Sequence, residues 1–156
     1  MKEKWKLLLI CLGLPVAVGA LSALLSGGGM QAFSQLNQPL LSPPGWLFPL
    51  VWTFLYLAMG LASYLVMTSD APVPQIKKAI RVYWLQLAVN FFWSIVFFRF
   101  SMYLAAFIWL VLLWGVIIVT MVRFYLIRER AGDLLVPYLL WVTFAGYLNF
   151  GIYLLN

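Results

Sequence analysis

Five long apolar runs constrain the fold of this chain more than any other feature. They cover residues 7–25, 46–67, 82–98, 102–122 and 134–155. Each run approaches or exceeds the ~18 apolar residues that cross a bilayer as a helix. Only 9% of the residues are charged. A soluble domain is about one quarter charged, and one of this size could not bury so much apolar surface.

Backbone chemistry decides between helices and strands for these runs. In hydrocarbon, every backbone N–H and C=O must find a partner within the protein, which only helices and closed barrels achieve. Barrel strands alternate apolar and polar residues, and these runs do not alternate. No internal repeat divides the chain. We therefore predict an all-α integral membrane protein, a five-helix transmembrane bundle that forms a single domain over residues 1–156.

The basic residues predict the orientation of this bundle. With five spans, the N-terminus shares one side with the second and fourth loops, and that side holds nine basic residues: Lys2, Lys4, Lys6, Lys77, Lys78, Arg81, Arg123, Arg128 and Arg130. The other side holds only Arg99. Because cytoplasmic loops are enriched in Lys and Arg, we expect a cytoplasmic N-terminus and an external C-terminus in a bacterial cell membrane. The basic residues flank apolar runs and form no patch typical of nucleic-acid binding, so we expect no nucleic-acid partner.

The first run has a second interpretation. A basic N-terminus, an apolar stretch and the small residues at Val18–Ala20 are also typical of a cleaved signal peptide. The run continues to Leu25, however, and this length favours a membrane anchor.

The residue types that carry most enzyme and metal chemistry are scarce in this chain. Histidine is absent, which removes the commonest general base, metal ligand and haem ligand. Cys11 is the single cysteine, so no intramolecular disulfide can form. The acidic residues lie outside the apolar runs. We therefore expect no metal site, no cofactor and no familiar catalytic constellation.

Polar and aromatic residues recur at helical spacing within three of the runs. They lie at i, i+4 and i+8 or close to it: Gln86, Asn90 and Ser94; Trp141, Ala145 and Asn149; Trp52, Tyr56, Gly60 and Ser63. An amide in hydrocarbon is costly unless it is paired, so these faces should point into the bundle. Two interpretations follow: interhelical hydrogen bonds with aromatic core packing, or a shared cavity with the lining of a small-molecule site. Trp46, at the end of its run, is typical of an interfacial anchor.

Three segments carry a more specific pattern. They are QPLLSPPGWLFPLVWTFLYLAMG from Gln38, LQLAVNFFWSIVFF from Leu85 and VPYLLWVTFAGYLN from Val136. Together, in this order, they resemble the TspO/MBR family, the tryptophan-rich sensory or translocator proteins. In the first segment the paired prolines fix a stiff bend just before the second run.

This resemblance implies a five-helix bundle that binds porphyrin-type tetrapyrroles, such as protoporphyrin IX, and hydrophobic drug-like compounds. The pocket would lie near the outer end of the bundle, capped by the first loop. By motif position the resemblance implies these ligand-binding residues: Trp52, Asn90, Trp93, Trp141 and Ala145, with Phe33 from the capping loop and Pro43 and Pro44 at the entrance. Ser94 joins them because it shares the face of Asn90.

Two departures from the family pattern alter these expectations. Family members usually carry a tryptophan shortly before the paired prolines, where this chain has Leu41. We therefore expect a weaker cap or a preference for other ligands. The mammalian cholesterol pattern needs a basic residue after a tyrosine, and none follows Tyr153. We infer no sterol binding from such a loose pattern.

Three functions remain open at this point. The first is a receptor, sensor or translocator for porphyrin-like ligands. The second is a light-dependent porphyrin-degrading enzyme in which Trp52 and Trp141 would be the redox partners. The third is a structural or regulatory membrane subunit without a ligand. The resemblance also points to a homodimer, and small residues at Ala58/Ala62 and Ala105/Ala106 offer surfaces for close helix approach.

Overall fold

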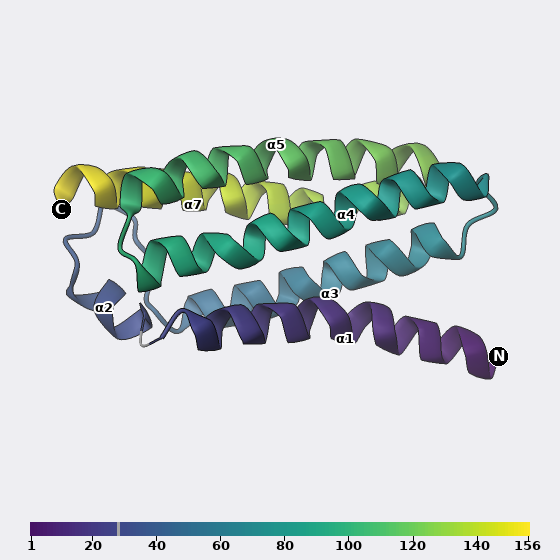
Figure 1. The fold of residues 1–156 in the computed structure, drawn as a ribbon, viewed down its shortest axis with the longest axis horizontal. Helices are drawn as coiled ribbons and strands as arrows, with labels where there is room; N and C mark the ends of the chain where they lie inside the picture. Colours follow the sequence, from purple (N-terminus) through teal and green to yellow (C-terminus); the bar gives the residue numbers. More distant parts are fainter. Residues whose placement is uncertain (28) are drawn as a thin grey trace.

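The computed structural model describes residues 1–27 and 29–156, and helices dominate it (Figure 1). In chain order these are α1 (Lys2–Leu25), α2 (Gly29–Gln35), α3 (Leu47–Met67), α4 (Val73–Ser94), the π-helical turn η1 (Ile95–Arg99), α5 (Tyr103–Ile127), α6 (Glu129–Asp133) and α7 (Val136–Leu155). Within the described residues, five segments are long and apolar enough to cross a membrane: α1, α3, α4 with η1, α5, and α6 with α7. The predicted all-α membrane bundle is confirmed.

The helices extend further toward one end of the bundle than the apolar runs do. The third span begins at Val73 and not at residue 82. Pro72 precedes the helix and Pro74 lies in its first turn, where the backbone N–H that proline lacks would have no partner within the helix. Lys77 therefore lies on a helix and not in a loop. In the same way α5 continues to Ile127, and α6 forms within the expected fourth loop. The apolar runs indicate only the residues that lie in hydrocarbon. The helices themselves continue beyond these runs into the polar residues that flank them.

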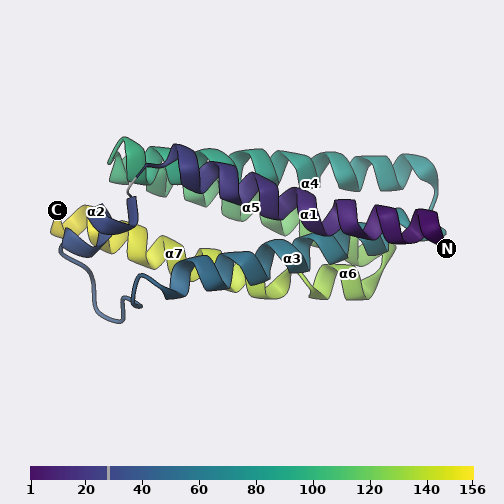
Figure 2. The same cartoon turned by 90° about the horizontal axis from the view of Figure 1, so that it is seen from below.

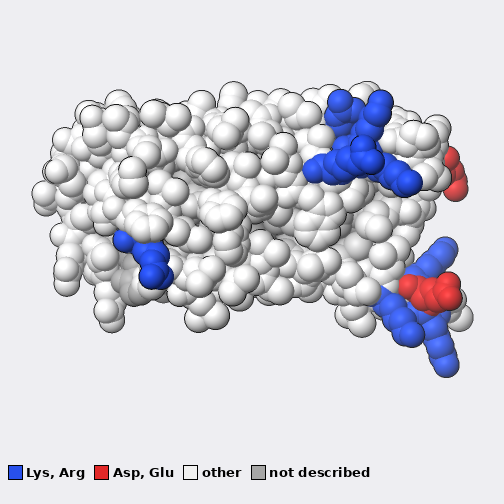
Figure 3. Space-filling view, in the orientation of Figure 1, with Lys and Arg blue, Asp and Glu red and all other residues white. Residues whose placement is uncertain are grey.

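The long helices run side by side, and the two ends of the bundle differ (Figures 1 and 2). α1 contacts α3, α4 contacts α5, and α5 contacts α7. The N-terminus and the α3–α4 connection lie at one end, whereas α2 and the C-terminus lie at the other (Figure 1). Most of the visible basic side chains gather at the end with the N-terminus (Figure 3). The first loop of the sequence thus contains a short helix, α2, that lies against the C-terminal end of the bundle.

Small residues are used for contacts within this one chain. A Cβ added to Gly60 would overlap the backbone carbonyl oxygen of Cys11, so α1 and α3 can meet there only because residue 60 is glycine. Ala62 and Ala106 are both 0% exposed. The expectation that these two alanines offer a surface to a second copy is therefore wrong, because helices of the same chain cover them.

Candidate functional site

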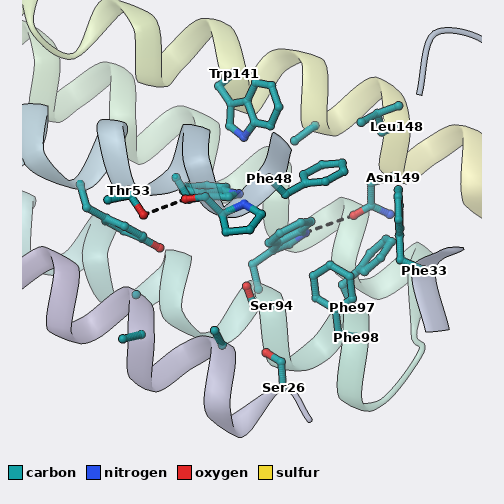
Figure 4. A pocket seen from close by; sticks show the side chains of 18 of the residues that line it. Ser26, Phe33, Phe48, Thr53, Ser94, Phe97, Phe98, Trp141, Leu148 and Asn149 are labelled. Carbon is teal, nitrogen blue, oxygen red and sulfur yellow. Dashed lines mark hydrogen bonds between the residues drawn. The ribbon is translucent and has the colours of Figure 1, made fainter. Parts of the chain in front are cut away.

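A cavity of about 310 Å³ lies in the half of the bundle that carries α2 and the C-terminus (Figure 4). This volume falls within the roughly 300–1,000 Å³ of small-molecule sites. α1 contributes Val16, Gly19, Ala20 and Ala23, and its C-cap contributes Ser26; α2 and α3 contribute Phe33, Phe48, Pro49, Trp52, Thr53 and Tyr56; α4 and η1 contribute Trp93, Ser94, Phe97 and Phe98; α7 contributes Trp141, Ala145, Leu148, Asn149 and Ile152. None of these lining residues is charged.

Eight of the twenty residues that line the cavity are aromatic. Phe33, from α2, is only 5% exposed and contacts the ring of Phe48 edge-on at a centroid distance of 5.2 Å. Phe48 in turn contacts Trp141 at 5.8 Å. Trp52 stacks on Tyr56 at 5.6 Å. These contacts connect α2, α3 and α7 around one space, and they give it broad apolar faces suited to a flat ligand.

The polar groups of the cavity differ in whether they are already paired. The indole N–H of Trp93 donates to Asn149 Oδ1 at 3.1 Å, and Asn149 Nδ2 donates to the backbone oxygen of Tyr103 at 2.8 Å. The buried Nε1 of Trp141, in contrast, has no hydrogen-bond partner among the described residues, and Figure 4 shows it directed toward the cavity. A buried donor left unpaired costs about 1–3 kcal/mol. A ligand with a hydrogen-bond acceptor would relieve this cost.

The amides nearer the middle of α4 serve the bundle itself. Asn90 Nδ2 donates to the hydroxyl oxygen of Tyr138 at 2.9 Å, and that hydroxyl donates to Gln86 Oε1 at 2.7 Å. All three side chains are buried. The face predicted from spacing therefore does point inward. The structure places Asn90 outside the cavity lining, in a hydrogen-bonded link between α4 and α7.

Six of the residues expected in the pocket lie together on its lining: Phe33, Trp52, Trp93, Ser94, Trp141 and Ala145. Pro43 and Pro44 lie in the connection between α2 and α3, outside the lining. The sequence reasoning missed the contribution of α1, because its first run carries no polar or aromatic face. The available signal was the run of small residues at Gly19, Ala20 and Ala23.

The segment 36–46, which we call the capping segment, is attached to the C-terminal turns of α7. The backbone N–H of Asn37 donates to Asn156 Oδ1 at 3.2 Å, and Asn156 Nδ2 donates to the Asn37 carbonyl at 2.9 Å. The hydroxyl of Tyr147 donates to the Leu40 carbonyl at 2.7 Å. Leu41 adopts a left-handed φ of 70°, a conformation that costs a non-glycine residue about 1–2 kcal/mol. These contacts with α7 hold the capping segment over that end of the bundle.

Comparison with known proteins identifies the family of this chain. A model of the TspO/MBR family matches residues 11–155. The "Tryptophan-rich protein TspO" of Chlorobaculum tepidum is 40% identical over 150 residues, which cover 96% of this chain and 95% of that protein. The "Tryptophan-rich sensory protein" of Cereibacter sphaeroides is 36% identical over 100% of this chain and 95% of its own length. The human "Translocator protein" is 36% identical over 83% of this chain and 77% of its own. The chain therefore belongs to the TspO/MBR family.

Proposed function

We propose that this membrane protein is a receptor or sensor that binds porphyrin-type tetrapyrroles, such as protoporphyrin IX, and hydrophobic drug-like compounds in the aromatic cavity. The observation that carries this proposal is the indole N–H of Trp141, which has no hydrogen-bond partner among the described residues and lies in a cavity whose described lining includes aromatic rings and no charged residue. Such a site favours a flat, largely apolar ligand that also presents a hydrogen-bond acceptor. Family membership supports the same role.

The proposal includes how the ligand is held. Ring stacking adds about 0.5–1.5 kcal/mol per aromatic pair beyond the burial of area. Because the chain has no histidine, the commonest axial ligand of haem iron is missing. Stacking and shape would therefore provide the affinity, and metal-free protoporphyrin IX fits at least as well as haem.

A fluorescence titration of the purified, monodisperse protein with protoporphyrin IX tests the proposal. Saturable quenching of the protein's tryptophan fluorescence supports ligand binding. Absence of saturable quenching in both detergent and lipid would favour the alternative of a ligand-free structural or regulatory subunit.

One contact supports photochemical degradation as a second candidate. The ring of Trp52 contacts that of Tyr138 edge-on at 6.2 Å, so two oxidisable side chains lie together beside the cavity. Comparing the loss of bound protoporphyrin IX in light and in darkness separates the two functions. If the parent protein and a Trp52→Phe variant lose bound protoporphyrin IX equally in light, the result supports binding without degradation.

We also propose a cytoplasmic N-terminus, an external cavity end and a homodimer. The nine-to-one distribution of basic residues supports the orientation, and the bacterial relatives support a bacterial membrane. Cross-linking in lipid and in several mild detergents tests the dimer, and a monomer under all of these conditions counts against it.

A further inference from the structure

The exposed part of the cavity lining is confined to two helices. Four of the lining residues are exposed: Ala20 and Ala23 of α1, and Pro49 and Thr53 of α3. The lining residues contributed by α2, α4, η1 and α7 are buried or half-buried. The open side of the cavity therefore lies between α1 and α3, and both of these helices are transmembrane segments.

The path of α1 explains this opening. α1 and α3 approach each other closely where Gly60 meets the backbone of Cys11, and again where Gly19 lies against the ring of Tyr56. Beyond these contacts the two helices separate toward the end that carries α2 (Figure 2). Thr53 lies six residues after the start of α3 at Leu47, or roughly 9 Å along the helix at 1.5 Å per residue. The opening thus lies beside the lipid, close to the boundary between headgroups and hydrocarbon.

The end of the cavity that faces water is covered. Phe33 lies over it and is 5% exposed. The capping segment that follows is held by the reciprocal hydrogen bonds between Asn37 and Asn156, and by the bond from Tyr147 to the Leu40 carbonyl. A ligand arriving along the bundle axis would have to break several of these contacts, whereas the opening between α1 and α3 requires none of them to break.

We infer that ligands reach and leave the cavity sideways, from the bilayer, through the opening between α1 and α3. This inference rests on the proposed function, because it takes the cavity to be the ligand site. It also defines the ligand class. The opening is lined by small apolar residues, proline and threonine, with no charge. It suits flat, largely apolar molecules that first partition into the membrane, and it offers no charged partner to a ligand.

Binding kinetics in lipid nanodiscs test the route, with protoporphyrin IX as the probe. Ala20→Leu and Ala23→Leu narrow the opening. Because a narrowed route slows both directions of passage, we expect the association and dissociation rate constants both to fall by about tenfold. Ala17→Leu is the matched control, since Ala17 is exposed on the same helix and lies outside the lining. It should leave both rates unchanged.

The capping segment provides the opposite test. Asn156→Ala removes the reciprocal bonds to Asn37 and loosens the cover. We expect it to leave the association rate within about twofold of the parent. The inference is overturned if Asn156→Ala accelerates association severalfold, or if Ala20→Leu and Ala23→Leu associate as fast as Ala17→Leu.

A measurement without porphyrin separates this inference from the proposed function. In a Cys11→Ala background, a spin label at Thr53→Cys should collide readily with oxygen, which concentrates in lipid, and poorly with a water-soluble nickel chelate. It should resemble a label at Ala17→Cys and differ from one at Leu41→Cys, which lies on the exposed capping segment. If the Thr53 label is accessible to the nickel chelate as the Leu41 label is, the opening faces water and the inference fails. Failure of the parent to bind protoporphyrin IX would overturn the proposed function instead.

Discussion

At the scale of single residues, Trp141 combines two contributions to binding that can be separated. Its ring contacts Phe48, and its N–H has no partner among the described residues. We expect Trp141→Ala and Trp52→Ala each to weaken protoporphyrin IX binding about fivefold to a hundredfold, because stacking and buried area are lost together. Trp141→Phe keeps a ring but no donor, and should cost about three- to tenfold if the ligand accepts this hydrogen bond. Fluorescence titration of folded variants measures each effect.

Trp109 is the control for these two tryptophans. Its N–H donates to the backbone oxygen of Val89 at 2.7 Å, and its ring lies outside the cavity lining. Trp109→Ala should reduce stability and leave the affinity of the folded protein nearly unchanged. If it weakens binding as much as Trp141→Ala does, the cavity is not the porphyrin site.

Asn90 illustrates how the same residue type can serve folding and not binding. Its amide donates to Tyr138, so Asn90→Ala removes a link between α4 and α7. Hydrogen bonds between transmembrane helices contribute about 0.6 kcal/mol on average and up to about 1.7 kcal/mol. We expect Asn90→Ala to lower the free energy of unfolding by an amount in this range in a denaturing-detergent titration. Its affinity for protoporphyrin IX should change less than twofold, and a loss comparable to that of Trp141→Ala would place Asn90 in the ligand site.

At the scale of helices, the contact between α1 and α3 depends on one glycine. A Cβ at position 60 would overlap backbone atoms of Cys11, and backbone cannot rotate away as a side chain can. We expect Gly60→Ala to destabilise the bundle by about 1–3 kcal/mol through overpacking. Gly13→Ala, on α1, is the control, because no atom in the described part of the chain lies within 4 Å of its added Cβ. It should leave stability unchanged or raise it, since alanine favours a helix over glycine by about 1 kcal/mol. Equal destabilisation by both substitutions would refute the close contact.

The part of the site that could be predicted consists of residues whose spacing in the sequence shows which face of their helix points inward. Trp52 and Trp141 recur with polar or small neighbours at helical spacing, so their inward orientation follows from the sequence, whereas Trp93 is expected in the pocket only from the family resemblance. The contribution of α1 does not follow from the sequence, because Ala20 and Ala23 acquire their place from the angle at which α1 crosses α3. The attachment of the capping segment to α7 could not be predicted from the sequence either, because Asn37 and Asn156 are 119 positions apart and meet only in the folded bundle.

At the scale of the whole molecule, length and hydropathy suffice for the five spans, whereas their ends depend on local chemistry. The third span begins at Val73 because proline initiates helices, which an apolar count cannot register. Hydropathy also fails to indicate α2, because its polar residues are typical of a loop. Only the folded structure shows that Phe33 of α2 packs against Phe48. Hydropathy predicts the segments that lie in lipid. The elements outside the lipid depend on contacts made after the bundle forms.

The orientation of the bundle in the membrane is the last testable consequence. Nine basic residues lie on the side that carries the N-terminus and only Arg99 lies on the other, and this distribution predicts a cytoplasmic N-terminus. The cavity, α2 and Asn156 would then face outward. A reporter active only outside the cytoplasm, fused through a linker after Asn156, should be active, and a cytoplasm-only reporter at the same position should be silent. Fusions before Met1 should give the reverse pattern. Cytoplasmic activity at Asn156 would place the capped end of the cavity inside the cell.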